Sequence, residues 1–246
     1  MEIEEYARIA AAEDDHWWYR NTRAVMADLL GPWLRAGATP GRVLDAGCGP
    51  GGNGAWLAAH GVVVGADLSR DALAYVCARR PTTAPVCATL ERLPFADAAF
   101  DVVAAITVLY CVADDQAALD ELARVVKPGG VVLLMEPAFR WLTRAHDKTV
   151  HSQRRYTRSG LVARVRHAGL RVARATYLYS FLVPPAALLA LAERLRPHAA
   201  AEAGSDVERR SLDPVFARLG RAERAWLRQY DLPFGTTVAV VADRPD

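Results

Sequence analysis

Glycines and carboxylates follow two successive apolar runs of this 246-residue chain, at positions that suit an adenosine-containing ligand. The first run ends in Asp45-Ala-Gly-Cys-Gly-Pro-Gly-Gly52. Glycines allow the backbone to approach a ligand closely, and a helix that begins after them offers free N–H groups. Asp67 follows Asp45 by 22 residues, at the end of the second run, where a carboxylate can accept both hydroxyls of a ribose. The glycine spacing also matches the dinucleotide fingerprint, so these residues leave the ligand open.

These side chains require a framework in which apolar strands alternate with helices. The spacing predicts strands at residues 42–46, 62–66, 85–88, 100–107, 131–135, 170–179 and 236–242, and helices at 53–60, 70–80, 115–126 and 157–168. Ser69 is a candidate N-cap of the second helix. Such alternation is typical of an α/β fold, here a Rossmann-like, seven-stranded, mostly parallel sheet with helices on both faces. Ligands of these folds bind at the carboxyl ends of the strands, where the glycine turn and Asp67 fall.

The pattern divides the chain into four parts. We expect N-terminal lid helices in residues 1–40, the core in 41–180, a helical insertion in 181–234 and the last strand of the core in 235–246. The insertion is rich in apolar residues, and a monomer rarely exposes such a surface. We therefore expect it to roof a substrate pocket or to form a homodimer contact, with docking on a membrane surface as the alternative.

Composition and charge narrow the class of protein. The net charge is only +2, which argues against a nucleic-acid-binding protein, although residues 140–180 hold ten Arg or Lys and one acid. That basic stretch suits an anionic partner or a solvated surface. The four cysteines show neither a CxxC pair nor a zinc-ligand spacing, so no metal is expected. Without an apolar N-terminal run or a membrane-length stretch, the chain is expected to be cytoplasmic, with no integral membrane segment.

Three segments together separate the alternatives for the ligand. Residues 43–51, 92–103 and 120–130 resemble, in order, the glycine motif, the segment leading into the fourth strand and the turn before the fifth strand of class I S-adenosylmethionine-dependent methyltransferases. The resemblance covers residues 41–137 and is strongest to small-molecule methyltransferases similar to the ubiquinone and menaquinone methylases. It implies S-adenosylmethionine as cofactor and S-adenosylhomocysteine as product.

Carried over position by position, the resemblance implies how the cofactor is held. Asp45 orients the turn near the ammonium group, while Gly47 and Gly49 pass under the methionine and ribose portions. Asp67 binds the ribose hydroxyls, and Leu68 lies against adenine.

Other cofactor residues come from further along the same resemblance. Thr107, after the fourth strand, is expected near the methionine end, and Tyr19 and Arg23 over the site, with Arg23 pairing the methionine carboxylate. Where the family commonly has an acid that accepts the adenine amino group, this chain has Thr89, followed by Leu90. That departure weakens the expected adenine contact.

The acceptor side is less determined, because methyl transfer from a sulfonium mainly requires alignment, exclusion of water and removal of one proton. His146, His151 and Tyr156 are the candidate catalytic residues, since a histidine titrates near neutral pH. Many relatives have Glu-His at the position of Tyr110-Cys111, so chemistry that needs that histidine is not carried over. The candidate substrate-binding residues are Tyr110, Cys111, Glu136 and Arg155.

The interpretation at this stage is a methyltransferase that acts on an oxygen, nitrogen or carbon of a small-molecule acceptor, anionic or hydrophobic, in the biosynthesis of a metabolite. The alternatives are a nicotinamide-dependent oxidoreductase, a noncatalytic S-adenosylmethionine-binding or assembly protein of the same fold, and an RNA or protein methyltransferase. The departures at Thr89 and Cys111 motivate the noncatalytic alternative.

Overall fold

The computed structural model describes residues 1–34, 41–195 and 212–246, which fold around one seven-stranded sheet. The strands are β1 (Gly41–Ala46), β2 (Gly61–Asp67), β3 (Thr83–Cys87), β4 (Phe100–Ile106), β5 (Val126–Pro137), β6 (Arg171–Leu178) and β7 (Thr237–Asp243). Their order is β3-β2-β1-β4-β5-β7-β6, with β7 antiparallel to its two neighbours and all other pairs parallel. This confirms the predicted mostly parallel sheet.

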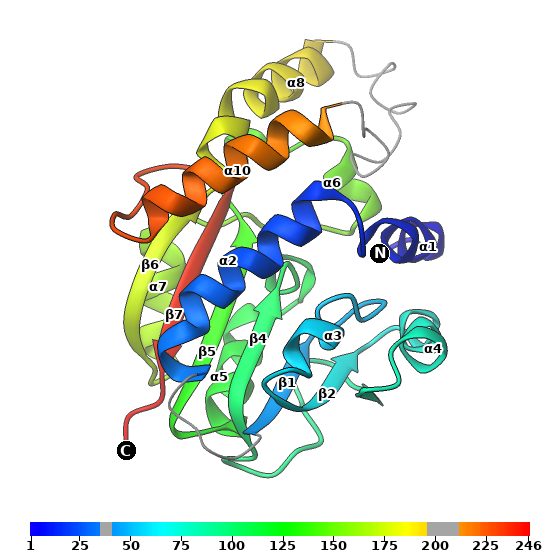
Figure 1. The fold of residues 1–246 in the computed structure, drawn as a ribbon, viewed down its shortest axis with the longest axis vertical. Coiled ribbons are helices and arrows are strands. Elements are labelled where there is room, and N and C mark those ends of the chain that lie inside the picture. The colour runs from blue at the N-terminus through cyan, green and yellow to red at the C-terminus, as the bar shows by residue number, and fades with distance from the viewer. Residues whose placement is uncertain (35–40, 196–211) are drawn as a thin grey trace.

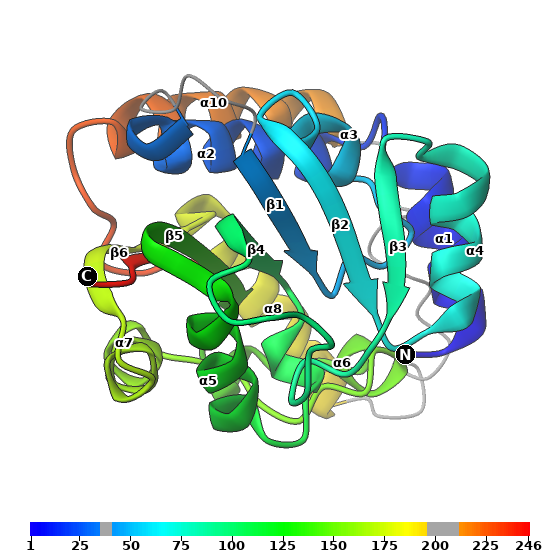
Figure 2. The same cartoon turned by 90° about the horizontal axis from the view of Figure 1, so that it is seen from below.

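Helices cover both faces of the sheet, as Figure 2 shows. One face carries α2 (Trp17–Leu34), α3 (Gly54–Leu57) and α10 (Asp213–Leu227), and the other carries α5 (Asp115–Val125) and α7 (Arg158–His167). At the β3 edge, α4 (Arg70–Arg79) packs on β2 and β3, and α1 (Ile3–Ala12) packs on α4. The N-terminal segment therefore lies beside the carboxyl ends of β1 and β2, on the side where the glycine turn opens.

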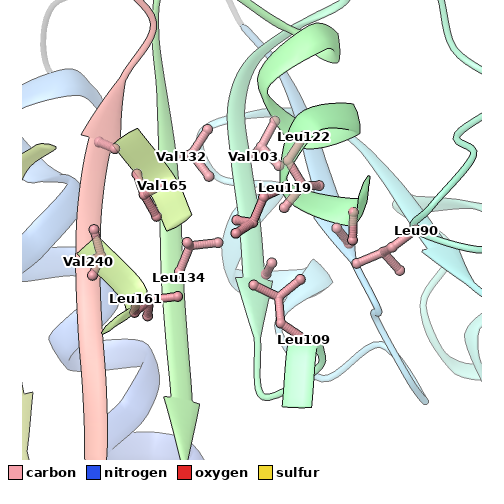
Figure 3. Packing of buried hydrophobic residues seen from close by; sticks show 14 of the residues in the cluster. Leu90, Val103, Leu109, Leu119, Leu122, Val132, Leu134, Leu161, Val165 and Val240 are labelled. Carbon is pink, nitrogen blue, oxygen red and sulfur yellow. The ribbon is translucent and has the colours of Figure 1, made fainter. Parts of the chain in front are cut away.

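Apolar residues fill both faces because successive strand residues point to opposite sides. In β1, Val43 joins the core under α2 and α10, while Leu44 joins the core under α5 and α7. On the second face, Leu119 and Leu122 of α5 pack toward Val103 of β4 (Figure 3). All five side chains are fully buried, so the central strands are rigid supports for the loops at their ends.

Local signals account for most element boundaries. The hydroxyl of Ser69 caps α4 by accepting from the N–H of Ala72, as predicted, and Thr157 caps α7 in the same way. The helix expected at 53–60 was wrong in length, since α3 is a single turn, Gly54–Leu57. The fifth strand was also placed too late, because β5 begins at Val126 and includes the turn at residues 127–130.

The predicted insertion before the last strand is present as α8 (Val183–Leu195) and α10, which lie at the same end of the molecule (Figure 1). Residues 196–211 of the predicted insertion, and 35–40 of the predicted lid region, lie outside the described part of the chain. In the ranges that are described, every helix is too short or too polar to cross a bilayer.

Candidate functional site

A cavity of about 1320 Å³ opens at the carboxyl ends of β1, β2 and β4, beneath α1, the start of α2, α8 and α10. A pocket for one small ligand commonly measures about 300–1000 Å³, so this cavity has room for two molecules side by side. The predicted site residues on its wall are Tyr19, Gly47, Gly49, Asp67, Leu68, Thr89, Leu90, Thr107, Tyr110, Cys111, His146, His151 and Arg155. Four others, Arg23, Asp45, Glu136 and Tyr156, do not line it.

The glycine turn after β1 is shaped by two different demands on its glycines. Gly47 has φ +72°, and a Cβ there would lie 2.2 Å from Cγ2 of Val108, so the loop that follows β4 (residues 107–112, the β4 loop) passes directly over it. Gly49 has φ +53° and open space where a Cβ would stand. Only glycine adopts these angles without strain, and the open side of Gly49 leaves its backbone accessible to a ligand.

Asp67 joins the turn to the end of β2. Its Oδ2 accepts the N–H of Gly49 at 2.8 Å, and its Oδ1 accepts the N–H of Ser69 at 2.8 Å. The two oxygens of a carboxylate can together accept about four hydrogen bonds, so Asp67, which lines the cavity, retains capacity to accept from a ligand. Burial raises the pKa of Asp67 above its ordinary value, while the backbone donors oppose that rise. The residue thus fixes the turn and still offers acceptors to a ligand.

Three buried carboxyl groups gather around this end of the cavity. Burial, together with the nearby charges of Asp67 and Glu13, raises the pKa of Asp45 to about 7. Among the described residues, Oδ2 of Asp45 has no hydrogen-bond partner. Burial also raises the pKa of Glu13, opposed by an ion pair with Arg80 at 2.6 Å. Such an excess of acceptors and negative charge favours a cationic ligand at this end.

The end of the cavity at which Leu68 was predicted to contact adenine has an apolar wall and an acidic side chain. Leu68 is 71% exposed at the edge of the cavity, an apolar surface that a flat base would cover. The hydroxyl of Thr89 donates to Glu91, and Glu91 lines the cavity as well. Sequence reasoning missed Glu91; an acid two residues after Thr89 was the available signal. Leu90 is buried beneath them.

The aromatic segment at the start of α2 forms one wall of the cavity. Tyr19 lines it and packs edge-on against Trp18 at 4.9 Å between ring centres. Burial raises the pKa of Tyr19 above its ordinary value, so its hydroxyl stays protonated. Arg23 lies behind this wall, where one guanidinium nitrogen contacts the carbonyl of Asp14 at 3.4 Å. Its Nη1 atom is buried without a hydrogen-bond partner among the described residues, and the pairing of Arg23 with a bound carboxylate stays a prediction.

Glu136 was expected to face the cleft, and it does not. It is fully buried at the end of β5, where its carboxylate accepts the N–H groups of Val108, Leu109 and Tyr110 at 3.2, 2.9 and 3.1 Å. Burial raises its pKa to about 8, against the effect of these donors. Glu136 thus holds the turn η1 (Leu109–Cys111), which brings Tyr110 and Cys111 to the cavity wall.

The predicted catalytic residues separate in space. His146, on the short helix α6 (His146–Thr149), lines the cavity. His151 also lines it, but its Nε2 is 3.0 Å from a carboxylate oxygen of Glu2. Tyr156 is buried away from the cavity and donates its hydroxyl to Asp115, so the expected catalytic role was misplaced.

Arg155 reaches the cavity wall with its charge already compensated. Its Nε and Nη2 atoms donate to the two carboxylate oxygens of Asp147 at 2.8 and 2.9 Å, and Nη1 donates to the carbonyl of Ala138. A bidentate pair of this kind is geometrically specific and leaves little positive charge for a substrate. Arg155 therefore braces the loop that carries His146.

Sequence reasoning also missed the way α1 closes the glycine end. The carboxylate of Glu13 packs against Gly52, where a Cβ would lie 2.4 Å from Oε2 of Glu13. Arg79 and Arg80 of α4 bind the end of α1 through the carbonyl of Ala10 and the side chains of Glu13 and Asp14. The acidic N-terminal stretch and the Arg79-Arg80 pair were visible in the sequence, but nothing there showed that they meet.

Comparison with known protein families gives a match to a family described as a methyltransferase domain, over residues 44–134. The matched segment runs from β1 to β5 and contains the glycine turn, Asp67 and the β4 loop.

Curated relatives extend beyond that segment. A malonyl-(acyl-carrier protein) O-methyltransferase from Enterobacter lignolyticus is 34% identical over 197 residues, which cover 76% of this chain and 75% of that protein. A demethylmenaquinone methyltransferase from Beutenbergia cavernae is 43% identical over 111 residues, which cover 42% of this chain and 46% of that protein. The chain thus spans less than half of the second relative.

Solved structures share the fold at low sequence identity. Phosphoethanolamine N-methyltransferase 2 from Haemonchus contortus, in complex with S-adenosyl-L-methionine, has a TM-score of 0.63 and 16% identity, covering 100% of this chain and 58% of that one. Geranyl diphosphate C-methyltransferase from Streptomyces coelicolor has a TM-score of 0.58 and 16% identity, covering 90% and 80%. These likenesses concern the fold alone.

Proposed function

The chain belongs to the class I S-adenosylmethionine-dependent methyltransferase family, and we propose that it transfers a methyl group from S-adenosylmethionine to a small-molecule acceptor. One observation carries the proposal. The glycine turn and Asp67 line one end of a cavity with room for two molecules, and the unpartnered carboxylate oxygen of Asp45 is buried behind that end. The carboxylates near the glycine turn attract the positive charge of S-adenosylmethionine, whereas they would repel the negative phosphates of a dinucleotide.

The residues present fit this cofactor from one end to the other. The free acceptors of Asp67 would hold the ribose hydroxyls, and Leu68 and Glu91 would meet the adenine ring and its amino group. Asp45 and Glu13 would stabilise the positive charges of the methionine portion. When bound, S-adenosylmethionine supplies an electrophilic methyl group on a good leaving group. The protein then has to align the acceptor and exclude water.

The acceptor half of the cavity is mainly apolar. The insertion contributes Leu182, Pro185, Ala186, Leu189 and Phe216 to its wall. Such a roof excludes water and favours a hydrophobic acceptor, with His146 as the group placed to remove a proton from it. His151 serves less well as a base, because Glu2 engages its ring.

Calorimetric titration tests the cofactor. Wild-type protein should bind S-adenosylmethionine, and Asp67→Ala should weaken binding at least about 10-fold, the lower end for loss of one hydrogen bond to a charged group. Asp67→Asn, which keeps one acceptor oxygen, should fall between the two. Asp71→Ala, an exposed acid four residues away, is the matched control and should bind as wild type does. Absence of heat from folded wild-type protein would overturn the proposal.

Transfer of a radiolabelled methyl group tests the reaction. Malonyl-(acyl-carrier protein) and demethylmenaquinone, the acceptors named for two relatives, are the first to try, followed by apolar phenols and quinols. With an acceptor in hand, His146→Ala should lower the rate about 100-fold, the low end for loss of a general base, and His151→Ala much less. Cofactor binding without transfer to any acceptor would favour a noncatalytic protein of the same fold.

A further inference from the structure

The outer face of α8 is entirely apolar. Leu188, Leu191 and Leu195 are 69%, 53% and 73% exposed, and their spacing places them on one side of the helix. Pro184 and Ala192 are exposed as well and extend the same face. The charged residues of the helix lie elsewhere, so this face offers water nothing to hydrogen-bond.

The outer face of α10 combines an apolar stripe with arginines. Val215, Leu219 and Trp226 are 49%, 42% and 56% exposed and follow one side of the helix. Arg218 and Arg221 are exposed beside this stripe, and neither forms an ion pair with the described residues. An apolar stripe with a tryptophan, bordered by arginines, is the pattern of a helix that lies in a lipid–water interface.

The acids of both helices are turned inward. Glu193 of α8 accepts from Arg144 at 2.9 Å and from the N–H of Ala145. Glu223 of α10 accepts the N–H and hydroxyl of Ser180 at 2.7 and 2.6 Å. Asp213 is 3.7 Å from a ring nitrogen of His16. The charges left on the outer faces of the described helices are therefore positive, which complements a negatively charged surface.

We propose that α8 and α10 dock the protein on an anionic lipid surface. A twofold contact through α10 is unfavourable, because it would bring Arg218 and Arg221 of the two copies together. Docking has a geometric consequence for the cavity. Leu189 of α8 and Phe216 of α10 line the cavity, so the helices that carry the exposed apolar faces also form part of its roof.

A hydrophobic acceptor dissolved in the lipid would thus meet the roof without crossing water. This consequence rests on the proposed methyl transfer, but docking itself does not, since it needs neither cofactor nor acceptor. Failure of one proposal is therefore distinguishable from failure of the other.

Co-sedimentation with vesicles tests the docking. Wild-type protein should sediment with vesicles of equimolar phosphatidylcholine and phosphatidylglycerol, and much less with phosphatidylcholine alone. Arg218→Ala with Arg221→Ala should weaken binding about 25-fold, at about 5-fold for each arginine near an anionic surface. The matched control, Arg70→Ala with Arg166→Ala, removes two exposed arginines on α4 and α7 and should bind as wild type does. Equal losses in the two double variants would mean a net-charge effect and would overturn the proposal.

The apolar component is tested separately. Leu191→Ser with Trp226→Ala should weaken vesicle binding at least about 10-fold without a change in melting temperature, because both side chains are more than half exposed. Sedimentation velocity without vesicles should show a monomer for wild type and variant. A wild-type dimer that this variant dissociates would assign the faces to a second copy and refute docking on lipid.

Discussion

Replacement of Asp45 by asparagine should make the ligand-free protein less sensitive to pH and its cofactor site weaker. Asp45 is 1% exposed at the end of β1, and its pKa is raised from 3.8 to about 7, first by burial and then by the charges of Asp67 and Glu13. The folded protein therefore resists ionisation of this group. The asparagine amide would keep the shape of the side chain and remove its charge.

The size of the effect follows from the pKa. A rise from 3.8 to about 7 corresponds to about 4 kcal/mol when the group is fully ionised. Because the folded state holds the proton more tightly than the unfolded state, the stability from this group is fully present below pH 3.8 and is lost as pH rises to about 7. Between about pH 5 and about pH 7, wild type should lose roughly 2 kcal/mol that Asp45→Asn does not lose.

Urea unfolding at several pH values measures this difference, with the exposed Asp71→Asn as control. Titration with S-adenosylmethionine near pH 6, in buffers of different ionisation enthalpy, should show proton release by wild type and little by the variant, because a cation favours ionised Asp45. The variant should also bind the cofactor more weakly at alkaline pH. Identical pH slopes of stability for wild type and Asp45→Asn would refute this account of the carboxyl cluster.

Three further outcomes follow from the site. Gly47→Ala should destabilise the protein and abolish cofactor binding, since a Cβ would lie 2.2 Å from Cγ2 and 2.6 Å from Cβ of Val108, whereas Gly129→Ala, at φ +73° with open space, should cost only about 1–2 kcal/mol. Val108→Gly, which removes both of these atoms, should partly rescue the first variant, and no rescue would contradict the collision. Glu136→Gln should lower the free energy of unfolding, measured by urea titration, by about 1–3 kcal/mol, because three N–H groups donate to its carboxylate. Unchanged stability would contradict the role of Glu136 in holding the β4 loop. Burial raises the pKa of Cys111 to about 11, so mass spectrometry should show iodoacetamide labelling it later than the exposed cysteines, and early labelling would argue against a closed η1 turn.

That most of the predicted cofactor residues would line one cavity was foreseeable, because most of them directly follow a strand of the sheet. The glycine turn, Asp67 and the β4 loop each follow a strand, and parallel strands bring their carboxyl ends to one edge whatever the packing around them. Departures from the family pattern were visible in the same way. Thr89 stood out, although the acid that it contacts, Glu91, was recognised only from the structure.

The acceptor end was less predictable because its residues meet only through tertiary packing. Glu136 looked like a site residue because it stands at the end of the fifth strand, and Tyr156 because it belongs to a run that also contains His146, His151 and Arg155. In the structure, the carboxylate of Glu136 lies under the β4 loop and accepts its N–H groups, and the hydroxyl of Tyr156 donates to Asp115. Sequence position alone does not say to which side such a residue points.

The sequence by itself determined the alternation of strands and helices, the glycine turn and the family, because period, turn chemistry and spacing are properties of neighbouring residues. Only the tertiary structure decided that α1 closes the glycine end through Glu13 and Arg80, and that α8 and α10 turn their acids inward and leave leucines and arginines outside. Those arrangements depend on contacts between residues far apart in the chain, for which a single sequence holds no local signal.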